Sequence, residues 1–519
     1  MDKIKIDIQG NGTLTADEID VFFQLLDKYT EDSKIEGHAT AEAAYQDAVD
    51  ALHERFPQFT IEVLKQFVRF KDPEVLRVLL ANAAHENPDG FTTDELLNIT
   101  DIGTWFQGNT EITSFDELAK TSITSLSSSA FDGCINLYSV DLPITLTSIL
   151  AGSNNHPFLN CPNLTSRINL DNIEFADNIF PHLDVQYYPN IQNLFLCGFN
   201  TYSGTCKALI CAGTMPSFGN LGRRMNDMVL ADFPRTISRC SVIHLASSGI
   251  NTIIRASSVP SGYHYNLPHL FVPRDACDKY IQIGYSANAI GGEEWQTAMR
   301  QLAEQYAPTY NPSFDIDNAD YSRAYIDYDI FGCDKSKAPY VLFDDLEVER
   351  VLLANATHAD ANTITHEELK NITSIGKMFT GNTDIVFADE LEYTSLSRLA
   401  DFEMFNGCTS LKSAKFPKTL ISVPYMTFRD CRSLEYFEIN DNCTGIGGWA
   451  FHSSGLKSIT IPKSVVEIGN LSFACLHLSE FNYEGTMEEW NAVTLASNWK
   501  QNAPFTVVHC SDGDSTRLA

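Results

Sequence analysis

The stretch "LKSITIPKSVVEI", residues 456–468, decides the fold of this protein. In it Ile459 and Ile461 alternate with polar residues, which is the period-2 pattern of a short β-strand with one buried face. A proline then ends the strand, because it has no backbone N–H to give to a sheet. Residues 137–149 and 411–423 superpose on this stretch residue for residue. The sequence therefore predicts a repeat with one short strand in each copy.

A longer period surrounds the strand. Phenylalanine recurs at intervals of 23, 23 and 22 residues, at Phe405, Phe428, Phe451 and Phe473. A cysteine follows three residues later, and a leucine three after that, at Cys408 and Leu411 and again at Cys431 and Leu434. One repeat cannot bury these residues alone, but stacked neighbours form a continuous apolar column. The cysteines of the column are expected to be small buried hydrophobes: Cys134, Cys161, Cys408, Cys431 and Cys475.

A second, larger repetition divides the chain. Residues 75–118 align without a gap on residues 348–391, and 25 of 44 positions are identical. In the first copy the periodic phrase then returns as Phe131, Cys134 and Leu137. The sequence therefore predicts two tandem modules of unequal size.

The phrase F-x-x-C-x-x-L-x-x-[IV]-x-[IL]-P resembles the BspA-like class of leucine-rich repeats, a family of bacterial surface adhesins and bacteriophage proteins. Residues 483–493 with 508–514 are similar to the C-terminal cap of that family, and residues 270–283 resemble the end of such an array. The resemblance implies an α+β fold: leucine-rich-repeat solenoids with short strands and no catalytic residue in the repeats. Residues 171–269 depart from the pattern, so we expect distorted repeats with insertions there.

Apolar faces on residues 15–72 predict a helical domain ahead of the solenoid. Residues 286–343 contain a helix-like run and then a segment rich in Asp and Tyr, which we interpret as a solvated linker. The expected organisation is a helical N-terminal domain (1–72), a helical capping segment (73–118), repeat array 1 with an irregular insertion (119–290), a linker (291–343), a second helical capping segment (344–394), and repeat array 2 with its C-terminal cap (395–519).

Composition excludes several classes of function. The net charge of −31 at pH 7 opposes binding to nucleic acid, since no basic stripe offsets it. No apolar run is long enough to span a membrane, and the N-terminus lacks the apolar core of a secretory signal. The 13 cysteines include no C-x-x-C pair, which argues against zinc ribbons and thioredoxin-type sites.

Residues 7–18 fit the spacing of an EF-hand calcium loop, in which the oxygen ligands would be Asp7, Gln9, Asn11, Thr13 and Glu18. The same stretch also fits a helix start, with a threonine N-cap and a glutamate three residues later. That capping box recurs in both modules, at Thr92 with Glu95 and at Thr365 with Glu368, whereas the calcium ligands do not recur. The helix start is therefore the preferred interpretation, and calcium remains the alternative. No other cofactor or metal is expected.

No nucleophile elbow, phosphate-binding glycine loop or zinc helix occurs, so we expect a protein without catalytic residues. Two roles follow: a bacteriophage virion component that assembles with other virion proteins or engages a receptor, and a bacterial surface adhesin or scaffold that binds a protein or glycan. The absence of an export signal and the intact Met1 favour the virion. In either role the strand faces supply the predicted contact residues: Ser139, Asp141, Ser413, Lys415, Tyr436, Glu438, Ser458 and Thr460.

Overall fold

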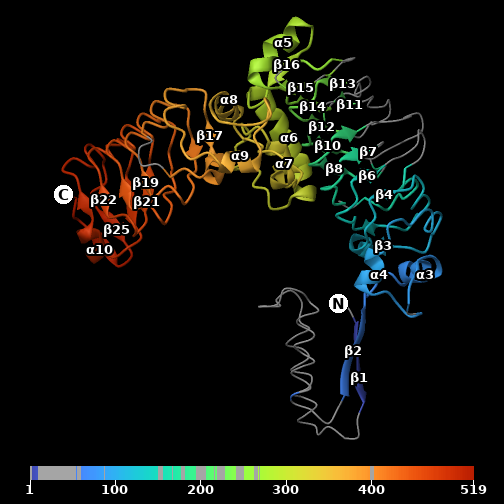
Figure 1. The fold of residues 1–519 in the computed structure, drawn as a ribbon. Helices are drawn as coiled ribbons and strands as arrows, with labels where there is room; N and C mark the ends of the chain where they lie inside the picture. The colour runs from blue at the N-terminus through green and yellow to red at the C-terminus, as the bar shows by residue number, and fades with distance from the viewer. Residues whose placement is uncertain are drawn as a thin grey trace. The chain divides into compact units, whose positions relative to one another are not determined.

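The computed structural model describes residues 3–9, 54, 60–86, 88–149, 156–165, 168–176, 180, 182–194, 206–215, 217–218, 228–240, 250–256, 258–261, 267, 269–397 and 402–518 (Figure 1). The chain forms two compact units. Unit 1 comprises residues 1–186 and 195–206, and unit 2 comprises residues 187–194 and 207–519.

Unit 1 begins with two antiparallel strands, β1 (Lys3–Gln9) and β2 (Thr60–Phe67), in which Asp7 lies opposite Glu62. The sequence predicts a helical domain over residues 1–72, but the structure shows that this domain also contains two strands. The alternating isoleucines of β1 form a strand, as period-2 patterns do. Glu54 is helical, and the rest of the helices expected between the two strands lie outside the described residues.

The first capping segment, here called cap 1, folds as predicted. Helix α3 (Pro73–Asn82) is N-capped by Asp72, and α4 (Thr93–Leu97) begins with the capping box of Thr92 and Glu95. The strands and the 3-10 helix that follow are β3 (Ser114–Phe115), η1 (Asp116–Lys120), β4 (Ser125–Leu126), β5 (Ser139–Val140), β6 (Ser148–Ile149) and β7 (Phe175–Ala176).

Two rows of parallel strands run along array 1 in unit 1: β3 pairs with β5, and β6 pairs with both β4 and β7. Between the rows the rings of Phe106, Phe131, Phe158 and Phe180 stack at centroid distances of 5.5, 5.0 and 5.2 Å. The first ring belongs to cap 1. The cap therefore supplies the first layer of the apolar column as well as covering its end.

Unit 2 opens with a parallel sheet whose strand order is β16-β15-β14-β12-β10-β8. Its strands are β8 (Val185–Tyr188, of which the last two residues belong to unit 2), β10 (Ala208–Cys211), β12 (Leu230–Phe233), β14 (Asn251–Ile254), β15 (His269–Val272) and β16 (Ala287–Ala289). Shorter strands β9 (Asn193–Leu194), β11 (Ser217–Phe218) and β13 (Arg239–Cys240) form a second parallel row. The described strands of unit 2 up to residue 272 thus form parallel rows, as the strands of unit 1 do.

Residues 291–343 are not a solvated linker. After η2 (Arg274–Ala276) and α5 (Cys277–Gln282), they form α6 (Glu293–Tyr310), α7 (Ile326–Ile330) and η3 (Lys335–Lys337), which lie beside the β10–β12–β14 sheet (Figure 1). Trp295 and Met299 of α6 are fully buried, as is Tyr328 of α7. The Trp295 ring of α6 packs against the Phe271 ring of β15, and the Tyr328 ring of α7 packs against the Tyr187 ring of β8, so both helices cover the sheet.

The second capping segment, cap 2, repeats cap 1 with α8 (Leu346–Asn355) and α9 (His366–Lys370). The remaining elements are β17 (Phe387–Ala388), η4 (Asp389–Tyr393), β18 (Ser413–Ala414), β19 (Ser422–Val423), β20 (Gly445–Ile446), β21 (Ser458–Ile461), β22 (Glu467–Ile468), β23 (Glu480–Tyr483), α10 (Met487–Ala492), β24 (Thr494–Leu495), β25 (Val508–Cys510) and β26 (Gly513–Ser515). One strand row is β19-β20-β22-β24 and the other β21-β23-β25-β26.

The column of array 2 has the predicted composition. Rings of Phe379, Phe405, Phe428, Phe451 and Phe473 stack at 5.2, 5.7, 5.4 and 5.3 Å. Each column cysteine donates its thiol to the phenylalanine carbonyl of the coil before it; the Cys431 Sγ lies 3.1 Å from the Phe405 carbonyl oxygen. Burial raises the pKa of Cys408 to about 12, which keeps that thiol protonated and able to donate. Buried Trp490 and Trp499 close the C-terminal end.

Candidate binding surfaces

The predicted contact residues divide into two groups. In the first coil of each array they serve the fold: Ser139 donates to Asp116 at 2.6 Å, and Ser413, at the aligned position, donates to Asp389. Lys415 is exposed and lies 3.8 Å from the Glu392 carboxylate. These side chains are engaged within the chain, so they offer little to a partner.

Asp141 lies just after β5 and is exposed. Desolvation by the surrounding residues and the negative charge of Asp116 both raise its pKa. The two acids therefore repel each other at the start of array 1, and a cation placed between them would lower the pKa of Asp141.

The second group is open and lies in array 2. Tyr436 is 58% exposed, and Glu438 and Thr460 are exposed, with Ser458 half-buried between them. We call these four residues the open strand face. The coil of Tyr436 is joined to β21 by a hydrogen bond from the Lys457 amide to the Glu435 carbonyl. The parallel register of β21 with β23 places Ser458 beside Glu480 and Thr460 beside Asn482.

In the first sheet of unit 2 the corresponding strand face is closed by a buried charge cluster. The guanidinium of Arg255, the residue after β14, donates to both carboxylate oxygens of Asp232 on β12, at 2.6 to 3.0 Å, and to Asp327 of α7 at 3.0 Å. It also donates to the Ala324 carbonyl and lies over the Tyr325 ring. Burial raises the pKa of both carboxyl groups, and that of Asp327 the more strongly, while the charge of Arg255 opposes the shift in both.

A second buried pair ties array 1 to cap 2. Arg235, which follows β12, forms an ion pair with Glu349 of α8, and both side chains are almost inaccessible to solvent. Burial raises the pKa of Glu349 to about 7 despite the opposing effect of Arg235. Both pairs were missed from the sequence, because ion pairs between distant segments leave no local pattern. The available signals were the apolar runs of β10 and β14 and a glutamate where cap 1 has Leu76.

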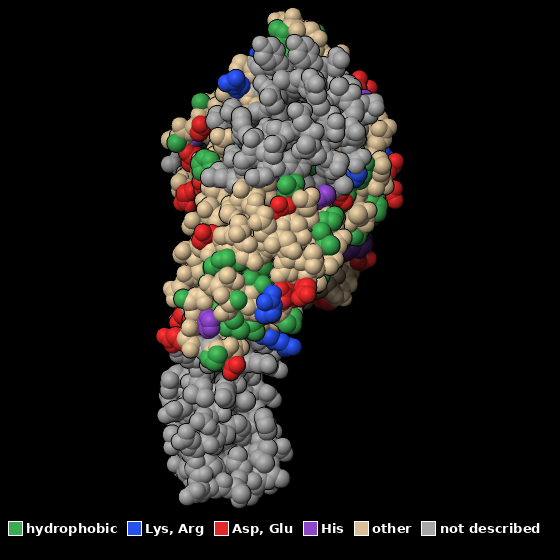
Figure 2. All heavy atoms as spheres, turned by 90° about the vertical axis from the view of Figure 1, so that its right-hand side faces the viewer, with side chains coloured by type: hydrophobic (Ala, Val, Ile, Leu, Met, Phe, Trp, Pro, Cys, Tyr) green, Lys and Arg blue, Asp and Glu red, His purple; other side chains and the backbone are tan. Residues whose placement is uncertain are grey.

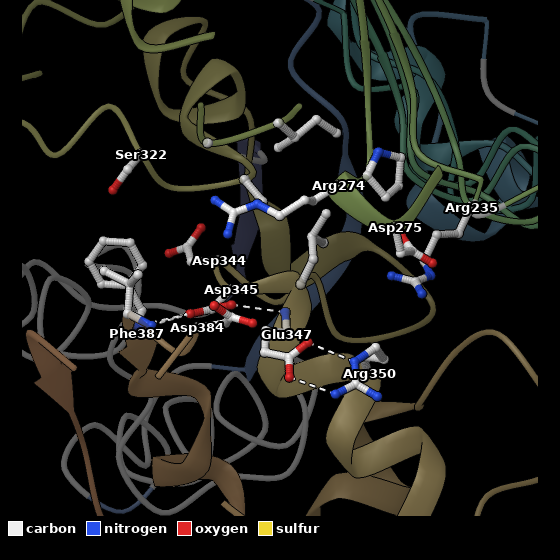
Figure 3. Close-up of a pocket in the computed structure, with 16 residues that line it drawn as sticks. Arg235, Arg274, Asp275, Ser322, Asp344, Asp345, Glu347, Arg350, Asp384 and Phe387 are labelled. Atoms are coloured by element: carbon white, nitrogen blue, oxygen red, sulfur yellow. Dashed lines mark hydrogen bonds and ion pairs between the residues drawn. The ribbon is translucent and has the colours of Figure 1, made fainter. Parts of the chain in front are cut away.

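A pocket of about 310 Å³ lies where the end of array 1 meets cap 2 (Figure 3). Three of its carboxylates already have partners: Asp344 pairs with Arg323 and Lys335, Asp345 accepts from the backbone of Glu347 and Val386, and Glu347 pairs with Arg350. Figure 3 draws no hydrogen bond or ion pair from Arg274 to the other residues that it shows. The pocket thus consists mainly of groups that hold the junction, and the charge of Arg274 helps to lower the pKa of Glu347.

The structure adds little to the calcium hypothesis. Asp7 and Gln9 lie in the paired strand β1 instead of following an entering helix, and Asn11, Thr13 and Glu18 lie outside the described residues. Across the described ranges no group of three or more His, Cys, Asp or Glu residues could hold a metal ion. Within the same ranges no helix is long and apolar enough to cross a membrane. On the face in Figure 2 the described Lys and Arg side chains are scattered among acidic ones.

Comparison with known proteins agrees with the repeat architecture. The model of the "BspA type Leucine rich repeat region" matches residues 92–184 and 399–500 in six copies. No curated protein matches the sequence significantly.

Two solved structures were also aligned. A leucine-rich cell surface protein of Faecalibacterium prausnitzii is 14% identical, with 76% of this chain and 86% of that chain covered and a TM-score of 0.22. A leucine-rich repeat protein of Bacteroides ovatus is 14% identical, with 86% and 94% covered and a TM-score of 0.23. On the matching family model and the repeat geometry together, residues 92–184 and 399–500 are leucine-rich repeats of the BspA type.

Proposed function

We propose that this chain is a non-catalytic binding protein of a bacterial surface, and that the open strand face of array 2 contacts its protein partner. The observation that carries the proposal is Tyr436, 58% exposed in a coil that is hydrogen-bonded to the residue before the parallel strand β21 and that also carries exposed Glu438. Tyrosines of this kind supply much of the binding energy in protein interfaces, because they bury a large area and lose little rotamer entropy. In contrast, every residue of β10, β12 and β14 is buried.

The role at a surface is supported by the repeat family, which occurs in surface adhesins. The virion component that the sequence first favoured has no support from the comparisons, so the surface adhesin or scaffold becomes the main proposal. Immunolabelling of intact producing cells tests the location, with lysed cells and purified phage particles in parallel. Label on intact cells supports the surface role. Label only on particles would restore the virion, and label only after lysis would contradict both.

A matched pair of tyrosines tests the contact face. Tyr393 is 58% exposed, the same fraction as Tyr436, but lies in η4. Beads coated with the full chain are added to neighbouring cells, with and without protease treatment of those cells. We expect protease-sensitive attachment that Tyr436→Ala and Thr460→Lys weaken and Tyr393→Ala leaves unchanged. Attachment that resists protease, or equal loss in the two tyrosine variants, would refute a protein contact at this face.

A further inference from the structure

A row of strained residues marks a second surface of array 2, on the turns between the two strand rows. Glu403, Met426, Trp449 and Leu471 each stand two residues before a column phenylalanine, and their φ angles are 62°, 56°, 60° and 56°. Side chains as large as Trp and Met rarely adopt this left-handed conformation, which glycine adopts freely. The aligned residues of array 1, Ser129 and His156, do not adopt it. Strain of this kind concentrates at functional sites.

The strained backbone is fixed by its neighbours. The amides of Glu403, Met426 and Trp449 each donate to a carbonyl of the next coil, at 2.9 to 3.0 Å. The conformation is therefore part of the solenoid ladder, and the side chains that it carries are held in one direction. Glycine would adopt the same backbone conformation without strain.

Aromatic rings line this row. Phe402 and Tyr425 are each 46% exposed, and Trp449 is half-buried. The Tyr425 ring lies across Gly448, since a Cβ there would be 3.5 Å from two ring carbons. The Trp449 ring lies 4.4 Å from the His452 ring at 33°. We call Phe402, Tyr425 and Trp449 the aromatic row.

Balanced charges accompany the rings. Lys377 pairs with Glu403 at 2.8 Å, and Arg429 Nε lies 3.4 Å from Asp430. The Arg429 guanidinium is 5.1 Å from the Trp449 ring centre, and its Nε is buried without a hydrogen-bond partner. Burial and Arg429 lower the pKa of His452, so this imidazole is neutral at pH 7.

We propose that the aromatic row binds a neutral glycan, whose pyranose rings stack on Tyr425 and Trp449 while Arg429 and Asp430 hydrogen-bond to its hydroxyl groups. The C–H faces of a pyranose ring are apolar and its rim is polar, which matches exposed rings beside a donor and an acceptor. Paired charges leave no net field to attract a polyanion, and the whole chain is strongly acidic. A protein partner fits less well, because protein interfaces place charged residues at the rim and not between their central aromatic residues.

Affinity electrophoresis of the full chain tests the proposal with three neutral polysaccharides, galactomannan, mixed-linkage β-glucan and arabinoxylan, and with anionic chondroitin sulfate as a comparison. We expect at least one neutral polymer to retard the chain. Tyr425→Ala and Trp449→Gly should each weaken that binding by about tenfold or more, and Tyr436→Ala, an exposed tyrosine of the other face, should not change it.

Stability provides the second measurement. Trp449→Gly relieves the strain of a positive φ but removes the ring contacts with His452 and Arg429, so its unfolding temperature should stay close to that of the wild type. Loss of binding without loss of stability is then evidence for contact with the glycan. No retardation by any neutral polymer, retardation by the anionic polymer alone, or full binding in both variants would overturn the proposal. Glycan binding does not depend on Tyr436 in this proposal. The result therefore leaves the proposed protein contact at Tyr436 to be decided by the attachment experiment.

Discussion

Cap 1 and cap 2 share their sequence and their internal hydrogen bonds. Asn109 donates to Glu74 at 2.6 Å in cap 1, and Asn382 donates to Glu347 at 2.6 Å in cap 2. The chain entering each cap is held in the same way. The Lys71 amide donates to Glu117 at 2.8 Å, as the Asp344 amide does to Glu390.

The two caps differ in their surroundings. Lys71 pairs with Asp116 inside cap 1, whereas its counterpart Asp344 pairs with Arg323 and Lys335 of the preceding segment. Leu76 is half-buried, whereas its counterpart Glu349 is buried against Arg235. Cap 2 thus has an acidic residue at two positions where cap 1 has Lys71 and Leu76. These two acidic residues, Asp344 and Glu349, form ion pairs with basic side chains of the preceding segment, so cap 2 forms a junction.

The largest effect is expected from breaking the closed face on which this junction depends. Arg255→Ala leaves two buried carboxyl groups without their cation, which should lower the free energy of unfolding of unit 2 by about 5 kcal/mol. Calorimetry should show a lower transition for unit 2 and an unchanged one for unit 1. Arg300→Ala removes an exposed pair with Glu304 and is the matched control. An equal loss in both variants would show that burial of the cluster contributes nothing.

The next largest loss of stability is expected when Glu349 of cap 2 is replaced by leucine, the residue at the aligned position 76 of cap 1. Glu349→Leu leaves Arg235 buried without a carboxylate, and we expect a loss of about 4 kcal/mol. The double variant Arg235→Met with Glu349→Leu should recover most of it, because apolar residues can replace a buried ion pair. The reciprocal Leu76→Glu in cap 1 should cost about 1 kcal/mol, since Leu76 is only half-buried. Chemical denaturation measures all three, and a double variant as unstable as the single one would contradict the pairing.

The stability of the junction should also depend on pH. The pKa of Glu349 rises from its ordinary 4.5 to about 7 through burial, and that of Glu390 rises to about 7 for the same reason and through Asp344. Because the folded state binds the Glu349 proton more tightly than the unfolded state does, protonation stabilises the fold. This stabilisation is complete below pH 4.5 and is lost as the pH rises through 7. For Glu349 the change in the free energy of unfolding is on the order of 3 kcal/mol. Unit 2 should melt at a lower temperature near pH 8 than near pH 5. The Arg235→Met and Glu349→Leu double variant should show a smaller difference, and an undiminished one would assign the effect elsewhere.

The smallest loss of stability is expected from removing the capping box that the two caps share. Thr92→Ala and Thr365→Ala each remove a capping box, and each should cost about 1 kcal/mol. Because the local geometry is the same, the two losses should agree within about 0.5 kcal/mol. Denaturation of the two variants checks this. A much larger loss in cap 2 would show that the α9 terminus also depends on the junction.

Local features were accessible from the sequence. The capping boxes, the Phe and Cys column, the strand at 458–461 and the end of array 1 at 269–282 all appear where the repeats predict them. Each depends on residues close in sequence or on a fixed period, so the pattern itself carries the information. The sequence did not show which predicted contact residues are engaged within the chain and which are open to a partner. Ser413 and Tyr436 occupy similar places in the repeat, yet Ser413 donates to Asp389 whereas Tyr436 is 58% exposed.

The amino-acid sequence alone determined the short repeats, the duplication of residues 75–118 as 348–391 and the capped helices of this protein. Only the tertiary structure decided that residues 291–343 cover a strand face, that Arg255 joins Asp232 and Asp327, and that Glu349 meets Arg235. The physical reason is the range of the interaction. A period repeats at short separation and is visible in a single chain, whereas a buried charge is stabilised by partners about 20 to more than 100 residues away, which no local pattern specifies.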